Sequence, residues 1–84
     1  MFRLDNKAVV ITGGGSGIGK AISTTFAKQG AIVYILEMDE KGAASTVDEI
    51  TAEGGKSSFF KCNIAVQQEV KAVIAQITQK HAAI

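Results

Sequence analysis

The sequence has a single cysteine, Cys62, and no proline. One cysteine cannot form a disulfide within the chain, which is typical of a protein from a reducing compartment. The longest apolar runs, Ala8–Ile11 and Ala31–Leu36, are far too short to cross a bilayer. The start of the chain, residues 1–7, is too polar for a signal peptide. We therefore expect a cytoplasmic protein with no membrane partner.

The sequence also lacks any block of like charge. Nine Lys and Arg and eight Asp and Glu leave a formal net charge of +1, and they are scattered along the chain. A nucleic-acid-binding protein usually concentrates its basic residues in one segment or on one face, so we expect no nucleic-acid partner. With 46% hydrophobic residues among 84, the composition indicates one small folded unit. We expect no second domain.

Short apolar runs alternate with segments of helical periodicity. The predicted strands are Lys7–Thr12, Ala31–Leu36 and Lys56–Cys62, and the predicted helices cover about 17–29, 39–53 and 66–81. This alternation indicates βαβ units around a parallel sheet. The first strand is a continuous β-branched run, as expected for a strand covered on both faces. We therefore predict an α/β fold, βαβαβα, with helices on both faces of the sheet.

Two details of the helices can be predicted from the same pattern. Ile18, Ile22 and Phe26 fall on one stripe of the first helix, and Gly30 stands where a helix C-terminal glycine belongs. Before the third helix, Ala65 is a poor residue for the N-cap. We expect that helix to fray at its first turn.

A glycine-rich stretch, TGGGSGIG at residues 12–19, joins the first strand to the first helix. Glycines let backbone N–H groups approach a phosphate closely, and the helix start adds unpaired N–H groups and a positive dipole end. This geometry favours pyrophosphate binding. The fingerprint G-x-G-x-x-G does not fit here, but the P-loop pattern G-x-x-x-x-G-K-[ST] fits from Gly14 to Lys20 and fails at Ala21. A P-loop-like phosphate binder without its usual Mg²⁺ ligand is therefore an alternative.

A third pattern, T-G-x-x-x-G-x-G, fits in full. Leu4, Lys7 and Ile11 precede it with the spacing L-x-x-K-x-x-x-(I/V)-T-G. Together these residues resemble the cofactor motif of the classical short-chain dehydrogenases/reductases. The resemblance implies a Rossmann-like sheet with strand order 3-2-1, truncated to the N-terminal half of an NAD(P)-binding domain over residues 1–84. It also implies an oxidoreductase that transfers hydride between a nicotinamide cofactor and an alcohol or carbonyl. The loop residues that it assigns to the cofactor are Thr12, Gly13, Gly15, Ser16, Gly17, Ile18 and Gly19.

The choice of cofactor depends on the end of the second strand. Glu37 lies 20 residues after Gly17, at the position of the ribose-binding acid of dinucleotide folds. Its carboxylate would accept hydrogen bonds from the ribose hydroxyls and repel a 2′-phosphate, and Asp39 is a second candidate for this role. NADP-preferring members of the family tend to carry a basic residue where Ser16 and Met38 stand here. The resemblance therefore favours NAD over NADP.

At the end of the third strand the family commonly has an aspartate and an aliphatic residue that hold the adenine. Asn63 and Ile64 occupy these positions here. We expect the Asn63 amide oxygen to accept a hydrogen bond from the adenine amino group, an altered form of the usual contact.

The residues that perform proton transfer in the family are not in this sequence. The one tyrosine, Tyr34, is followed four residues later by Met38 instead of the lysine of a Tyr-x-x-x-Lys pair. We expect Tyr34 and Cys62 to be core residues and His81 to interact with a helix dipole, and we assign no catalytic or metal-binding residue. The chain is then either the cofactor-binding portion of an enzyme or a non-catalytic nucleotide-binding or assembly module.

The expected partners follow from the family's strand order. In that order a fourth strand lies beside the first, so without it the edge at Lys7–Thr12 is unpaired. We expect this edge to pair either with the remainder of the enzyme or with a second copy of the chain.

Overall fold

The computed structural model describes residues 4–13 and 17–81, which form three strands and three helices. In chain order these are β1 (Ala8–Thr12), α1 (Gly17–Lys28), β2 (Ile32–Glu37), α2 (Glu40–Ala52), β3 (Lys56–Lys61) and α3 (Gln67–Lys80). All six elements begin and end within one residue of their predicted bounds. None of these helices is both long enough and apolar enough to span a membrane.

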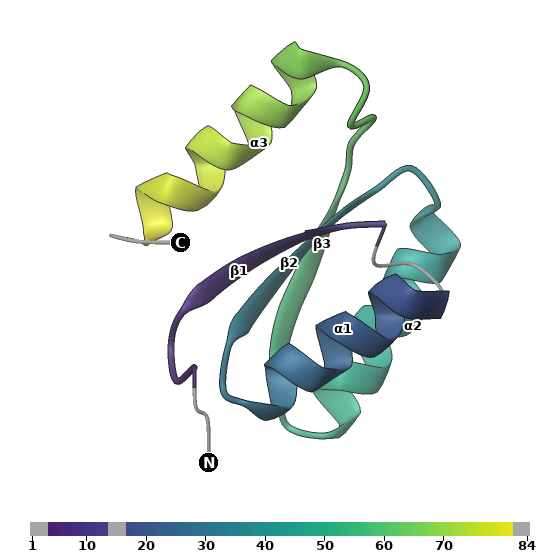
Figure 1. Ribbon diagram of the computed structural model, residues 1–84, viewed down its shortest axis with the longest axis vertical. Coiled ribbons are helices and arrows are strands. Elements are labelled where there is room, and N and C mark those ends of the chain that lie inside the picture. Colours follow the sequence, from purple (N-terminus) through teal and green to yellow (C-terminus); the bar gives the residue numbers. More distant parts are fainter. Residues whose placement is uncertain (1–3, 14–16, 82–84) are drawn as a thin grey trace.

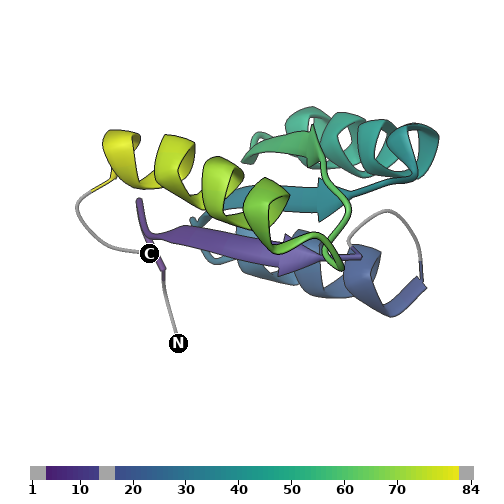
Figure 2. The same cartoon turned by 90° about the horizontal axis from the view of Figure 1, so that it is seen from above.

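The three strands form one parallel sheet in the order β1-β2-β3. β2 lies in the middle, with Val33 opposite Val9 of β1 and Ser57 of β3. Helices α1 and α2 cover one face of the sheet and α3 covers the other (Figures 1 and 2). The predicted α/β fold, with strand order 3-2-1 and helices on both faces, is therefore confirmed.

The core consists of two layers, one on each face of the sheet. Successive residues of a strand point to opposite faces, and β2 is apolar on both, with Val33 and Ile35 toward one layer and Tyr34 and Leu36 toward the other. The layer beneath α1 and α2 contains Ile11, Ala27, Ala31, Val33, Ile35, Ala43 and Ile50. The layer beneath α3 contains Ala8, Tyr34, Leu36, Cys62, Val73 and Ile77. The continuous apolar run of β2 thus reflects burial on both faces.

The face of helix α1 that packs on the core is not the face that carries most of its large apolar side chains. Ser23 and Ala27 are its buried residues, whereas Ile18 is 80% exposed and Ile22 is 41% exposed. The Ser23 hydroxyl donates to the Gly19 carbonyl oxygen at 2.8 Å, which satisfies the hydroxyl without a tertiary partner. Small side chains on this face let α1 lie close to the sheet. The predicted stripe exists, but two of its three residues lie at the surface.

The ends of α3 differ from the prediction in two ways. The N-cap is Val66, not Ala65, and no side chain caps the first turn. At the other end, Nε2 of His81 lies 2.6 Å from the Tyr34 hydroxyl, and the two rings pack edge to face. His81 therefore connects the end of α3 to the central strand through Tyr34, in addition to the dipole interaction expected from the sequence.

Gly30, in the turn between α1 and β2, provides a test of this packing. Its φ is +93°, and a Cβ added there would lie 2.1 Å from Oδ1 of Asp5. Gly54 has a φ of +83° with nothing near its Cβ position, so it is a matched control for backbone strain alone. We expect Gly54→Ala to lower the free energy of unfolding by about 1 kcal/mol, and Gly30→Ala by at least about 2 kcal/mol. Urea unfolding of the two variants measures the difference, and equal losses would show that Asp5 moves away freely.

Candidate functional site

The carboxyl ends of the three strands meet at one edge of the sheet. All three strands run in the same direction (Figure 2), so Thr12, Glu37 and Lys61 end neighbouring strands there. In open α/β sheets this edge is where ligands bind. Those predicted site residues that the structure describes lie at or just after these three strand ends, on the same side of the molecule.

The glycine-rich loop leaves β1 through a hydrogen bond to β2. The Gly13 N–H donates to the Leu36 carbonyl oxygen at 3.1 Å, which continues the β1–β2 ladder past Thr12. Gly13 and Gly17 have φ values of +71° and +56°, in the left-handed region that favours glycine. Thr12, Gly13 and Gly17 are exposed and Gly19 is half-buried. The predicted site residues Gly15 and Ser16 lie outside the described residues.

Glu37 lies beside this loop. A Cβ added at Gly13 would be 3.9 Å from Oε2 of Glu37. The other carboxylate oxygen, Oε1, accepts hydrogen bonds from the backbone N–H groups of Met38 at 3.0 Å and Asp39 at 3.2 Å. The turn after β2 thus orients the carboxylate and directs Oε2 toward the loop.

Asp39, the second acidic candidate, has a different role. It is the N-cap of α2, and its Oδ1 accepts a hydrogen bond from the Gly42 N–H at 3.1 Å. Asp, Asn, Ser and Thr are the side chains best suited to this position, because a short oxygen-bearing chain can reach the free N–H groups of the first turn. The geometry therefore distinguishes the two acids: Asp39 begins α2, and Glu37 faces the loop.

The third strand leads into a tight turn at Asn63. The Cys62 N–H donates to the Glu37 carbonyl oxygen at 3.3 Å, so β3 stays paired with β2 one residue past its end. Asn63 Oδ1 accepts from the Ala65 N–H at 3.0 Å, and the Asn63 N–H donates to Oε1 of Glu69 at 3.1 Å. The amide oxygen expected to meet adenine is therefore already an acceptor, with one lone pair remaining.

Glu69 was not among the residues singled out from the sequence. It stands three residues after the N-cap of α3, the position from which a glutamate reaches back over a helix start in a capping box. That spacing is the signal that could have identified it. Glu69 holds the turn that presents Asn63 and Ile64, and Ile64 and Met38 are exposed on the two loops that follow β3 and β2.

Lys20 and Ala21 bear on the P-loop alternative. In a P-loop the lysine at this position reaches the nucleotide phosphates. Here the Lys20 ammonium forms an ion pair with Glu49 on α2, so it is directed along the helix layer. The alanine at position 21 leaves the pattern without its usual Mg²⁺ ligand, so the P-loop alternative is the weaker one.

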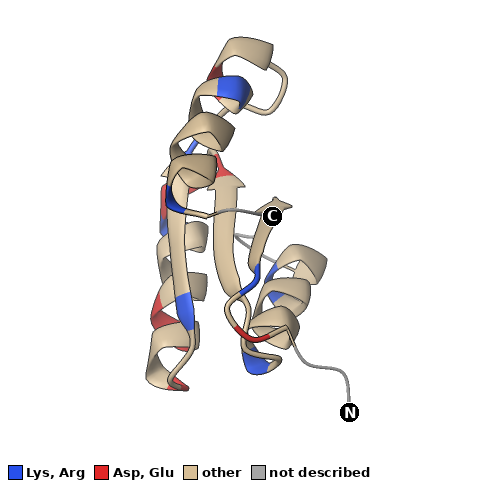
Figure 3. Ribbon diagram, turned by 90° about the vertical axis from the view of Figure 1, so that its left-hand side faces the viewer, with Lys and Arg blue, Asp and Glu red and all other residues tan. Residues whose placement is uncertain are grey.

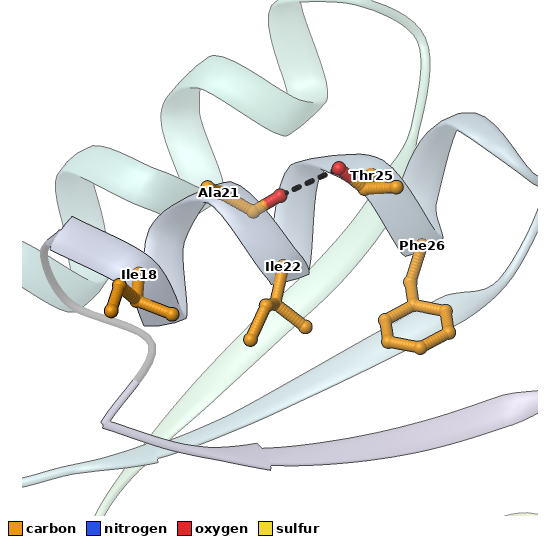
Figure 4. Close-up of a pocket in the computed structure, with 5 residues that line it drawn as sticks. All are labelled: Ile18, Ala21, Ile22, Thr25 and Phe26. Carbon is orange, nitrogen blue, oxygen red and sulfur yellow. Dashed lines mark hydrogen bonds between the residues drawn. The ribbon is translucent and has the colours of Figure 1, made fainter.

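An apolar hollow lies along α1. Its lining residues are Ile18, Ala21, Ile22, Thr25 and Phe26. Ile18, Ile22 and Phe26 project on the same side of the helix, toward β1 (Figure 4), while the Thr25 hydroxyl donates to the Ala21 carbonyl oxygen at 2.8 Å. With almost no polar atoms, the hollow has the character of a packing surface. Ile18 belongs both to this surface and to the end of the glycine loop.

Comparison with known proteins places these features in a family. The family model for short chain dehydrogenases matches residues 7–84. Among curated relatives, the 3beta-hydroxysteroid dehydrogenase of Mediterraneibacter gnavus is 38% identical over 81 residues, which cover 96% of this chain and 29% of that protein. The chain thus spans less than a third of that relative's length.

Two solved structures carry different cofactors on the same fold. A 7 alpha-hydroxysteroid dehydrogenase complexed with NADH and 7-oxo glycochenodeoxycholic acid is 41% identical, with a TM-score of 0.87 over 93% of this chain and 31% of that one. A metagenomic short-chain oxidoreductase in complex with NADP is 26% identical, with a TM-score of 0.89 over 94% of this chain and 36% of that one. A nicotinamide dinucleotide is therefore common to these neighbours. The matching family model, the parallel sheet and the glycine loop at its carboxyl edge show that the chain belongs to the short-chain dehydrogenase family.

Proposed function

We propose that this chain is the NAD(H)-binding portion of a short-chain dehydrogenase/reductase. The complete polypeptide would transfer hydride between the nicotinamide ring and an alcohol or carbonyl substrate. The observation that carries the proposal is the position of Glu37, whose Oε2 lies 3.9 Å from the Cβ position of Gly13. An acid fixed at that distance from a glycine loop suits a ligand that has both a pyrophosphate and a ribose diol.

Each part of the cofactor has a suitable group in this arrangement. The pyrophosphate would lie against the glycine loop and the first turn of α1, with Thr12, Gly13, Gly15, Ser16, Gly17, Ile18 and Gly19 around it. Glu37 would accept hydrogen bonds from the adenosine ribose hydroxyls. Met38 and Ile64 would flank the adenine, with the remaining lone pair of Asn63 Oδ1 available for its amino group. The bound nicotinamide supplies the hydride chemistry, and this chain's residues supply binding and orientation.

The same geometry favours NAD(H) over NADP(H). A 2′-phosphate would place close to two negative charges beside the carboxylate of Glu37. Two backbone N–H groups already hold that carboxylate in position. Turning it away would break both hydrogen bonds, so Glu37 discriminates by repulsion as well as by attraction.

Replacing Glu37 by glutamine tests this proposal. The change keeps the shape of the side chain and removes its charge, so we expect NADH to bind about tenfold more weakly. NADPH should bind to this variant as tightly as to the unmodified chain or more tightly, so the preference for NADH over NADPH becomes smaller. Glu53→Gln, at the far end of α2, is a control with the same change of charge.

Calorimetric titration of each variant with NADH and NADPH measures both affinities. Tighter binding of NADPH than of NADH by the unmodified chain would contradict the proposal. An equal effect of Glu37→Gln and Glu53→Gln would also contradict it.

We expect the isolated chain to bind cofactor without turning over a substrate. Its one tyrosine, Tyr34, is 6% exposed and is held by His81 on the α3 face of the sheet, so it cannot exchange a proton with a bound alcohol. Absorbance at 340 nm, with NAD⁺ and a panel of secondary alcohols, measures any activity. Sustained, alcohol-dependent formation of NADH by pure chain of verified mass would refute this expectation.

An assembly role is a second candidate, favoured by the surface beside β1. β1 is an edge strand of the described sheet, and the exposed Ile18 and Ile22 lie with the half-buried Phe26 along the adjacent helix α1 (Figure 4). A free strand edge next to apolar side chains is a template for pairing with another chain. In a longer polypeptide the remaining residues would cover this surface. In the isolated chain, we propose that two copies pair their β1 strands antiparallel across a two-fold axis, which gives a continuous sheet.

Light scattering over a range of concentrations tests this pairing. We expect the isolated chain to form dimers, and Ile22→Lys to raise the dissociation constant at least about tenfold by placing a charge in an apolar contact. Val66→Lys is the matched control, because Val66 has a similar exposure and begins α3, on the opposite face of the sheet from α1 (Figure 2). A stable monomer at high concentration, with Val9–Ile11 amides exchanging as slowly as those of Val33–Ile35, would rule out the pairing.

A further inference from the structure

Lys61, at the end of β3, lies on the strand next to Glu37. The two residues are direct partners in the parallel register, so their side chains leave the sheet on the same face, from strands about 4.8 Å apart. The positions at which NADP-preferring members of the family tend to carry a basic residue, Ser16 and Met38 here, lie in the loop and directly after β2. The register adds a cation from the neighbouring strand.

The end of β2 and the start of α2 are acidic, with Glu37, Asp39 and Glu40 at three of four successive positions. Glu37 and Asp39 already accept hydrogen bonds from backbone N–H groups. Glu40, in the first turn of α2, is the partner of Lys61, with Oε2 at 3.9 Å from the Lys61 ammonium nitrogen. Figure 3 shows charges of both signs at this end of the sheet.

The ion pair holds Lys61 only loosely. Its distance is at the upper limit for a salt bridge, and both side chains are 57% exposed. Pairs of this kind contribute little to stability and exchange readily with solvent. A flexible ammonium group with three donors can therefore turn to another anion that arrives nearby.

We propose that Lys61 sets how strongly this chain discriminates between NADH and NADPH. The inference rests on the proposed function, because it assumes that the adenosine ribose lies at Glu37. A phosphate on the ribose 2′ position would attract the Lys61 ammonium away from Glu40, which offsets part of its repulsion by Glu37. NADH has no charge at the ribose 2′ position, so Lys61 changes the affinity for NADPH and has almost no effect on the affinity for NADH. Glu40 opposes the effect by holding the cation.

Titration of the full chain with NADH and with NADPH tests this role. We expect Lys61→Gln to weaken NADPH binding about two- to fivefold, the range for one exposed ion pair, and to change NADH binding less than twofold. Lys56→Gln is the matched control, since Lys56 is an exposed lysine at the opposite end of the same strand. Raising the salt concentration to about 0.5 M should reduce the effect of Lys61→Gln, because salt screens exposed charges.

Glu40→Gln supplies the opposite change. It frees Lys61 and removes a negative charge, so NADPH binding should become about two- to fivefold tighter. In the double variant most of this gain should be lost, because the two side chains act on each other.

The outcomes separate the two proposals. If NADH binds, but Lys61→Gln and Lys56→Gln change the affinity for NADPH equally, the role of Lys61 is overturned and the proposed function stands. Failure of both cofactors to bind would overturn the proposed function and this inference with it. A loss of NADPH binding confined to Lys61→Gln, and reduced by salt, would support it.

Discussion

The parallel pairing of β2 with both of its neighbours is the constraint on which the candidate site depends. The ladder on each side continues past the ends of the outer strands: Gly13 donates to Leu36 on one side, and Cys62 donates to Glu37 on the other. Two successive carbonyl groups of one strand thus anchor the glycine loop and the turn at Asn63. The candidate site residues come from three segments that are distant in the sequence, but their spacing is set by one strand.

Burial on both faces keeps β2 in place. Val33, Ile35 and Leu36 are at most 1% exposed, so shifting the register by one residue would exchange the side chains of the two core layers. The buried polar side chains Ser23 and Thr46 bond to carbonyl groups of their own helices. These bonds satisfy the hydroxyl groups within the helices, and the small side chains let α1 and α2 lie close to the sheet. The consequence at α1 is an apolar stripe left at the surface.

Local pattern was sufficient to predict most of this fold. Strand runs, helical periodicity and the glycine pattern gave the six elements within one residue and, with the family resemblance, the strand order. The adjacency of the loop and Glu37 followed, since both lie at carboxyl ends of parallel neighbours. The contact of Tyr34 with His81 did not, because the two residues are 47 positions apart and no motif links them.

The partner that each charged side chain takes at the candidate site depends on which of several nearby groups lies within reach. Spacing favoured Glu37 and left Asp39 as a second candidate, and the capping bond from Gly42 to Asp39 separates the two roles. Lys20 matched a P-loop lysine in the sequence, yet Glu49 on α2 pairs with it. Lys61 became a candidate for cofactor discrimination only through the strand register, which places it opposite Glu37. Such choices are decided by tertiary geometry, which periodicity does not encode.

The central claim is that the carboxyl edge of the sheet binds a nicotinamide dinucleotide. A series of ¹H–¹⁵N correlation spectra of the chain, recorded during titration with NADH, tests it most directly. The account predicts concentration-dependent shifts for the amides of Gly13, Gly17, Met38 and Asp39. Those of Gly54 and Gly55, at the opposite edge of the sheet, should remain unchanged. Shifts centred on Gly54 and Gly55, or no saturable shifts at millimolar NADH, would contradict the account.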